Sequence, residues 1–128
     1  MRRPAMVVDS NERGTLCESV LRKAEKAGLS VIRRPLVVGD YLLGEACVEA
    51  KSINDLFLSS HSGHLWRQLE NMDINYQRFF LVIHGGIDKY VAMAKKSGKR
   101  VTYTRIQNEL TGTIARIMSD FECQVFYT

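Results

Sequence analysis

The sequence lacks the features that mark secreted and membrane proteins. No apolar run approaches the roughly 20 residues that span a bilayer, and no signal-peptide pattern opens the chain. Its three cysteines, Cys17, Cys47 and Cys123, are odd in number and lack metal-ligand spacing. We therefore expect reduced thiols in an intracellular protein, with Cys123 in the core, and we exclude a disulfide framework.

Repeats, low-complexity tracts and linkers are also missing, so residues 1–128 are predicted to form one domain. That length is sufficient for a single hydrophobic core. Hydrophobic residues make up 45% of the chain and charged residues 25%, which is ordinary for a soluble globular protein. The net charge of +4 fits an anionic partner but does not by itself identify one.

The N-terminal part of the chain predicts two strands separated by a helix. Residues 5–8 are an apolar run that ends in a polar turn, and residues 30–36 form a second strand. A proline near the end of the second strand marks it as an edge strand or a strand end. Between them, Thr15 with Glu18 predicts a capping box, and apolar residues at helical spacing follow until Gly28.

Two further helices are predicted in the middle of the chain. Ser52 with Asp55 predicts a capped helix start, which gives Asp55 a structural role, and this helix extends to about residue 59. Residues 61–64 interrupt the pattern, and helical spacing resumes over residues 65–76.

The C-terminal part continues the alternation. Residues 79–83 are continuous and apolar, as in a strand covered on both faces. Residues 87–96 are predicted to be helical, Thr104 with Gln107 caps a last helix, and residues 124–127 form a final short strand. Alternating strands and helices favour an α/β domain of three layers, α/β/α, with a mixed central sheet.

A carboxylate pair is predicted around a tight turn. Gly44 and Glu45 have the composition of a two-residue hairpin turn, and in that register Asp40 lies directly opposite Glu49. Cross-strand neighbours have Cβ atoms about 5 Å apart, so the two carboxylates repel each other. A divalent cation between them would convert this repulsion into binding. Lys51 shares the face of Glu49, whereas Ala50 points the other way.

Two carboxylates and a lysine on one surface suit metal-assisted hydrolysis of phosphodiesters. Asp40 and Glu49 are the best candidate ligands of Mg²⁺ or Mn²⁺. Lys51 could orient or deprotonate the attacking water, or neutralise charge in the transition state. The alternatives remain open at this point: the triplet also occurs by chance in surface hairpins, and Lys51 could be a solvated partner of Glu49.

Two more acids follow the first predicted strand. Asp9 and Glu12 stand where loops at strand ends gather site residues in α/β sheets. We expect Asp9 to be the next metal ligand and Glu12 to hold a metal-bound water; a solvated turn is the alternative. His61 and His64 lack a third ligand and suitable spacing, which favours loop polarity over a metal site.

Five ordered blocks extend this pattern, and together they resemble the nuclease domain of the XPF/Hef family of structure-specific endonucleases. The resemblance covers essentially the whole chain. Its blocks are residues 8–13 (Val-Asp-Ser-Asn-Glu-Arg), 38–41 (Val-Gly-Asp-Tyr), 48–52 (Val-Glu-Ala-Lys-Ser) with Asp55, 63–65 (Gly-His-Leu) with Gln68, and 80–83 (Phe-Leu-Val-Ile).

The resemblance implies a restriction-endonuclease-like core, a Mg²⁺ or Mn²⁺ site, and cleavage of forked, flapped or branched DNA near the junction. By the same resemblance, the catalytic positions are Asp9, Glu12, Asp40, Glu49 and Lys51, and metal is held by Asp9, Asp40 and Glu49. The resemblance also places Arg13, Arg67 and Gln68 at the DNA.

The chain departs from the family at three arginines. Ala50, Asn11 and His64 stand where the family usually has arginine. These changes bear on phosphate gripping, activity level and substrate choice, while the acids remain, which favours a working or weakly working nuclease over an inactive one. The alternative is a non-catalytic partner domain that binds branched DNA or a nuclease subunit.

The resemblance further implies dimers, as homodimers or heterodimers, that pair through the last helices and strand. The predicted stripe over residues 106–121 would then be part core and part dimer surface. We expect no helix-hairpin-helix domain in this chain, and an intracellular location, in the cytoplasm of a prokaryote or in a nucleus. Basic pairs such as Lys95–Lys96 and Lys99–Arg100 are plausible phosphate contacts, although such charges usually form a solvated face.

Overall fold

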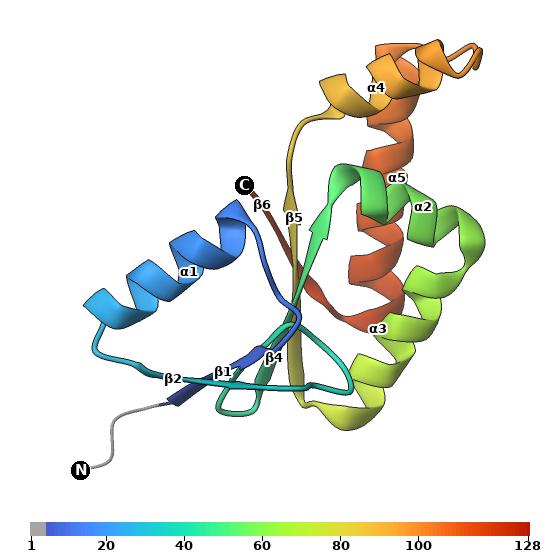
Figure 1. Ribbon diagram of the computed structural model, residues 1–128. Helices are drawn as coiled ribbons and strands as arrows, with labels where there is room; N and C mark the ends of the chain where they lie inside the picture. Colours follow the sequence, from blue (N-terminus) through green and yellow to red (C-terminus); the bar gives the residue numbers. More distant parts are fainter. Residues whose placement is uncertain (1–4) are drawn as a thin grey trace.

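A computed structural model describes residues 5–128 of the chain (Figure 1). Its elements in chain order are β1 (Ala5–Asp9), α1 (Thr15–Lys26), β2 (Ser30–Arg34), β3 (Tyr41–Leu43), β4 (Ala46–Ser52), α2 (Ile53–Ser62), α3 (His64–Asn75), β5 (Arg78–His84), α4 (Ile87–Lys96), α5 (Tyr103–Phe121) and β6 (Gln124–Tyr127). The strands form one sheet in the order β2-β1-β3-β4-β5-β6. β3 runs antiparallel to β1 and β4, and the other neighbouring pairs are parallel.

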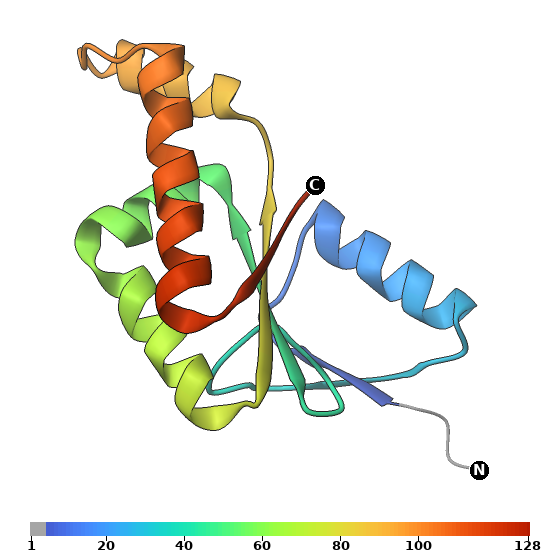
Figure 2. The same ribbon diagram turned by 180° about the vertical axis from the view of Figure 1, so that it is seen from behind.

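Helices cover the two faces of this sheet unequally. Figures 1 and 2 show α1 alone on one face, and α2, α3 and α5 on the other, with α4 against α5. The predicted α/β/α fold with a mixed central sheet is confirmed. β2 lies at one edge of the sheet, as its proline-containing sequence predicted, and it ends at Arg34, directly before Pro35, which has no N–H for a ladder hydrogen bond.

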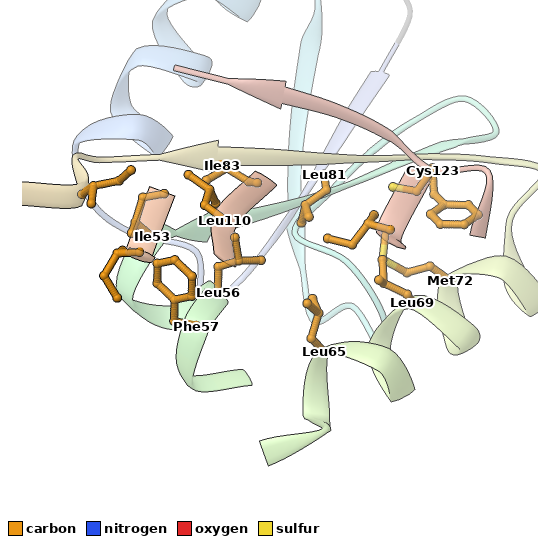
Figure 3. Close-up of a cluster of buried hydrophobic side chains, with 14 of the residues drawn as sticks. Ile53, Leu56, Phe57, Leu65, Leu69, Met72, Leu81, Ile83, Leu110 and Cys123 are labelled. Carbon is orange, nitrogen blue, oxygen red and sulfur yellow. The ribbon is translucent and has the colours of Figure 1, made fainter. Parts of the chain in front are cut away.

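The larger hydrophobic core fills the space between the sheet and the α2, α3 and α5 layer (Figure 3). Leu81 and Ile83 of β5 are fully buried there against side chains such as Phe57 of α2 and Leu69 of α3. Fully burying a large apolar side chain contributes about 1.5–3 kcal/mol. The core therefore holds α2 and α3 against one face of the sheet. Every second residue of β4 points to this same face.

The second face of β5 is less covered than its apolar sequence predicted. Phe79, Leu81 and Ile83 are buried, but Phe80 and Val82 on the opposite face are only half-buried. The smaller core beneath α1, around Val8 and Tyr41, covers β1 and β3. The expectation of a strand buried on both faces is wrong, because on this face a cavity of about 210 Å³ separates Leu16 and Val20 of α1 from Val82.

Two of the three predicted helix caps are misplaced. Ser52 caps α2 as predicted, since its Oγ accepts a hydrogen bond of 3.1 Å from the Asp55 N–H. Thr15 and Thr104 are instead already inside their helices. Gly14 precedes α1 without a side-chain cap, and Thr102 caps α5 by accepting from the Arg105 N–H at 3.1 Å.

The interruption between α2 and α3 is a single residue. Gly63 has φ of 83°, a left-handed conformation that glycine adopts without a steric penalty, and it ends α2 and begins α3. α2 therefore continues through His61 to Ser62, beyond the end that the sequence predicted. The sharp change of direction lets both helices pack on the sheet.

The remaining composition-based expectations concern thiols and membranes. Cys17, Cys47 and Cys123 are buried and free, and Cys123 belongs to the larger core, as predicted. Within residues 5–128, no helix is both long and apolar enough to pass through a bilayer.

The position of the α5 cap can be tested with two neighbouring threonines. Thr102→Ala should lower the free energy of unfolding by about 1 kcal/mol, because it removes the acceptor of the Arg105 N–H. Thr104→Ala is the matched control and should change stability by less than about 0.5 kcal/mol. Urea unfolding followed by circular dichroism measures both. A larger loss from Thr104→Ala than from Thr102→Ala would contradict this assignment.

Candidate active site

The hairpin predicted around Gly44 and Glu45 is present. Leu43 pairs with Ala46 and Tyr41 with Val48, and Gly44 has φ of 61°. Asp40 lies just before β3, so it is next to Glu49 in this register although it is not itself a ladder partner.

The main chain fixes the Asp40 side chain from two directions. The Asp40 N–H donates to the Val48 carbonyl at 2.9 Å, and the Asp40 Oδ2 accepts from the Ala50 N–H at 2.7 Å. Gly39, with φ of 85°, lets the chain pass against Cys47, since a Cβ at this position would lie 2.2 Å from the Cys47 Sγ. Glycine is thus required for Asp40 to reach β4.

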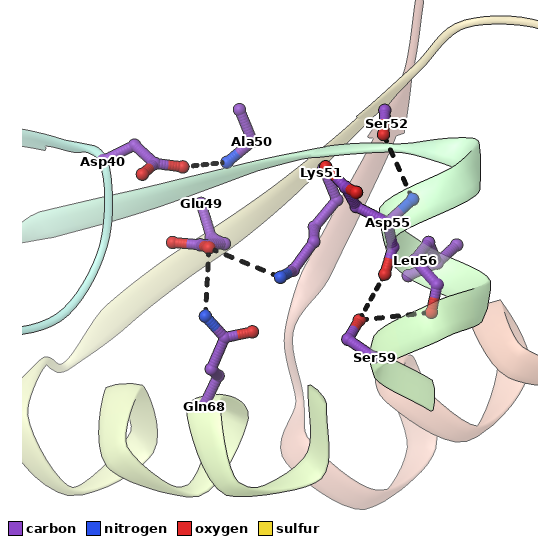
Figure 4. Close-up of polar contacts among 9 residues, drawn as sticks. All are labelled: Asp40, Glu49, Ala50, Lys51, Ser52, Asp55, Leu56, Ser59 and Gln68. Atoms are coloured by element: carbon purple, nitrogen blue, oxygen red, sulfur yellow. Dashed lines mark hydrogen bonds and ion pairs between the residues drawn. The ribbon is translucent and has the colours of Figure 1, made fainter. Parts of the chain in front are cut away.

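Glu49 points away from Ala50 into the layer of α2 and α3 (Figure 4). Its residue is 8% exposed. The Glu49 Oε1 lies 3.9 Å from the Lys51 Nζ and accepts a hydrogen bond of 3.3 Å from the Gln68 Nε2 of α3. Glu49 and Lys51 therefore share a face, as period-two spacing predicted.

The proximity of the acids changes their protonation. Burial and the negative charge of Asp40 raise the pKa of Glu49 to about 8, although Lys51 opposes the shift. Burial and Asp40 also raise the pKa of Glu12 to about 7. Asp40 is thus the common neighbour of two carboxyl groups that resist ionisation, which is the condition that a bound cation relieves.

Asp9 contacts Asp40 through its main chain, whereas its carboxylate bonds to the loop after β2. The Asp9 N–H donates to the Asp40 carbonyl at 2.8 Å, which ties the end of β1 to the start of β3. The Asp9 Oδ1 accepts from the Leu36 N–H at 2.9 Å and so holds the loop after β2. The negative charge of Asp9 contributes to the raised pKa of Glu12.

The acids around Asp40 are a candidate metal site on grounds of charge, and the described part of the chain does not show an assembled one. Among residues 5–128, no three His, Cys, Asp or Glu side chains form a ready-made metal cluster. Mg²⁺ typically uses one or two carboxylates and completes its shell with water and substrate phosphate. Asp40 and Glu49 satisfy that requirement, and the three-residue set with Asp9 stays a prediction.

A cleft of about 330 Å³ opens over Asp40 and Glu49. One wall is the loop of residues 37–39, and the other is the polar face of α3, with His64, Gln68 and Asn71. These three residues recur at the i, i+4, i+7 spacing of one helix face. That spacing is the signal in the sequence for a site wall on α3: it was missed for Asn71, and His64, which was expected to be a polar loop residue, begins α3 and lines the cleft.

The three residues that resemblance placed at the DNA have different positions. The Arg13 Nη1 donates to the Ser10 and Glu12 carbonyls at 2.7 and 2.9 Å, so it braces the loop that carries Glu12. Arg67 is exposed on α3. Gln68 contacts Glu49, and its own Oε1 is buried without a hydrogen-bond partner within the described chain.

Comparisons with known proteins give matches in both sequence and fold. The profile of the ERCC4 domain matches residues 8–128. The chain is 38% identical over 93 residues to DNA repair endonuclease UVH1 of Arabidopsis thaliana, a match that covers 72% of this chain and 9% of that protein. It is 32% identical over 111 residues to DNA repair endonuclease XPF of Cricetulus griseus, which covers 84% and 12%. The chain thus spans about a tenth of the length of these relatives.

A solved structure of XPF from Aeropyrum pernix in complex with DNA has a similar fold. The TM-score is 0.73 at 25% sequence identity, and the match covers 98% of this chain and 56% of that one.

The raised pKa values predict how stability depends on pH. Because the pKa of Glu49 is about 8 in the folded chain, against 4.5 for an unperturbed glutamate, the folded state binds the extra proton. The protonated Glu49 therefore contributes fully to the free energy of unfolding below about pH 4.5, and this contribution is lost as the pH rises toward 8. Between these limits, the melting temperature of the unaltered chain should fall at least about 4 °C further than that of Glu49→Gln.

Thermal melts in chelator, followed by circular dichroism, measure this difference. Glu70→Gln, which alters an exposed acid on α3, is the matched control and should keep the full pH dependence. Equal pH dependence in Glu49→Gln and the unaltered chain would refute the raised pKa.

Proposed function

The chain belongs to the ERCC4-domain family, and from this premise we propose that it is an endonuclease dependent on Mg²⁺ or Mn²⁺ that cleaves branched DNA, a fork or a flap, near the junction. The observation that supports the proposal best is that Asp40 and Glu49 line one cleft, with the Lys51 Nζ 3.9 Å from the Glu49 Oε1. The named relatives are DNA repair endonucleases, and the similar solved structure is a complex with DNA.

Asp40 and Glu49 fit a hard divalent cation because they supply carboxyl oxygens, and a cation would favour the ionised form of Glu49, whose pKa is raised to about 8 without one. Such a cation, when bound, polarises the scissile phosphate and lowers the pKa of an attacking water. The main-chain N–H of Ala50 orients Asp40, and Gln68 and Lys51 orient Glu49 from the other side. The ligands are therefore held in place before substrate arrives, which reduces the cost of assembling the site.

Lys51 supplies the positive charge in this arrangement. Its side chain is 11% exposed and lies on the same face as Glu49. From that position it stabilises negative charge that develops on the phosphate or orients the attacking water. Asp9 and Glu12 lie at the border of the site, where Glu12 accepts or delivers a proton near neutral pH, because its pKa is raised to about 7.

The alanine at position 50 leaves the carboxylates and the lysine of the candidate site in place. Its side chain points away from Glu49 and is packed against the smaller core beneath α1. This favours a working nuclease over the non-catalytic partner domain, because substitution on that face leaves the carboxylate pair intact. Ala50 also lines a separate cavity with Glu12 and His84, so the lost arginine bears on substrate contacts beside the site.

Two further expectations belong to this proposal. The last helix buries Ile106, Leu110 and Ile117, while Met118 is 52% exposed, as for a helix that is part core and part dimer surface. Pairing with a second copy or a related subunit stays a prediction, which sedimentation velocity would decide. A role in DNA repair would place the protein with the genome, in a prokaryotic cytoplasm or a nucleus.

Cleavage of an end-labelled forked duplex tests the proposed reaction. With Mn²⁺ or Mg²⁺, the unaltered chain should cut near the junction, and chelator should abolish cutting. Asp40→Asn and Glu49→Gln should each lower the cleavage rate at least about 100-fold, because each removes charge stabilisation from the site. Asp73→Asn and Glu70→Gln change exposed acids on α3 and should cleave at the unaltered rate.

Cleavage that survives both site substitutions would refute the assigned site. Binding of the fork without cleavage by any form would support the partner-domain alternative.

A further inference from the structure

The positive charge of the chain is concentrated in one corner of the fold. Residues 88–105 contain six basic residues and one acid, whereas the rest of the chain contains twelve basic and thirteen acidic residues. The net charge of +4 is thus a property of this segment. We call its basic residues the basic corner: Lys89, Lys95, Lys96, Lys99, Arg100 and Arg105.

The basic corner is exposed and not neutralised by acids. All six residues are exposed. None of the ion pairs found within residues 5–128 includes any of them. Cations gathered without counterions repel one another, and a polyanion relieves this repulsion.

The backbone of the corner is well defined. Ile87, Val91 and Ala94 bury one face of α4. After the helix, the N–H groups of Ser97, Gly98 and Lys99 donate to the carbonyls of Met93, Lys95 and Ala94 at 3.0–3.1 Å. Gly98 has φ of 82°, which closes the turn. The basic side chains therefore project from a fixed turn and not from a loose loop.

Helix stability explains only part of this charge. Lys95 and Lys96 at the C-terminal end of α4 are favourable toward the helix macrodipole. Arg105 in the first turn of α5 has the opposite effect, because the N-terminal end of a helix is already positive, and the first turn of α5 contains no acid. Arg105 therefore lowers the stability of α5, and helix stability does not explain its presence.

The basic corner lies beyond the carboxyl ends of the parallel strands β4 and β5, and β4 carries Glu49 and Lys51. β4 and β5 are parallel, with Lys51 beside Ile83 and Ser52 beside His84, and α4 begins shortly after β5 ends. Figures 1 and 2 place α4 and the following turn at the end of the molecule toward which β5 runs. α4 has 10 residues, so its far end is about 15 Å beyond its start.

We propose that the basic corner binds the phosphate backbone of a duplex arm of the DNA that is cut at the candidate active site. Each strand of duplex DNA carries a phosphate every 3.4 Å or so along the axis, so an arm that extends past the end of β5 would present a row of phosphates to the corner. Such contacts supply affinity and orientation without sequence preference. This inference rests on the proposed function, which it extends to a second contact surface.

The test compares two triple variants of equal charge. Lys95→Gln, Lys96→Gln and Lys99→Gln together remove three charges from the corner. Arg22→Gln, Lys23→Gln and Lys26→Gln remove three exposed charges from α1, including its C-terminal turn, and serve as the matched control. Fluorescence anisotropy with a labelled 30-base-pair duplex, in chelator and over a range of NaCl concentrations, gives the affinity and its salt dependence.

The corner variant should bind at least about 10-fold more weakly near 100 mM salt, and the slope of log affinity against log salt should decrease by about 2–3. The control should keep the slope of the unaltered chain. With Mn²⁺, the corner variant should also cleave the forked duplex more slowly than the control variant and the unaltered chain, because it binds the duplex arm more weakly.

The outcomes separate this inference from the proposed function. An unchanged slope in the corner variant, or an equal loss in the control, would overturn the inference while the nuclease stands. A lowered slope without metal-dependent cleavage by any form would support the corner and refute the nuclease. Loss of binding to phosphatidylserine vesicles but not to DNA would assign the corner to a membrane surface and overturn the inference. Circular dichroism melts verify that both variants are folded.

Discussion

The structure of the site depends on one electrostatic conflict, the placement of Asp40 beside the buried carboxyl group of Glu49. The Ala50 N–H fixes Asp40, and Gln68 and Lys51 restrain Glu49, so neither side chain can relieve the repulsion by turning to solvent. The raised pKa of Glu49, about 8, is the direct consequence of burial and of this neighbour. A protein retains such a conflict at a cost to stability, and in the proposed function a divalent cation would convert that cost into binding.

The rest of the fold supports that pair. The strand β4 presents Glu49 and Lys51 to one face and Ala50 to the other, and the apolar contacts of α3 with the sheet bring Gln68 up to Glu49. Gly39 permits the close passage against Cys47 that places Asp40. β5 runs parallel to β4 and leads into α4, which carries part of the basic corner. The proposed phosphate contacts of the basic corner therefore follow from the same topology that positions Glu49 and Lys51.

Sequence alone predicted the parts of this arrangement that depend on local periodicity. The hairpin turn, the shared face of Glu49 and Lys51, the opposite direction of Ala50 and the alternation of strands and helices all follow from spacing and turn chemistry. Sequence-based prediction was wrong where tertiary contacts determine the helix start or the burial of a strand. Thr104 has a capping sequence, yet α5 begins at Tyr103 and is capped by Thr102. The apolar run of β5 does not show that one face of the strand is only partly covered. The contact of Gln68 with Glu49 joins distant elements and could not be derived from spacing.

The most direct test of the central claim is the affinity of the chain for Mn²⁺ without DNA, measured by electron paramagnetic resonance of free Mn²⁺. The account predicts one site per chain near neutral pH, with affinity that increases between about pH 6 and pH 9 as the carboxyl groups of Glu12 and Glu49 ionise. Asp40→Asn should weaken binding at least about 10-fold, whereas Asp73→Asn should leave it unchanged. Equal affinity in Asp40→Asn and the unaltered chain would contradict the account.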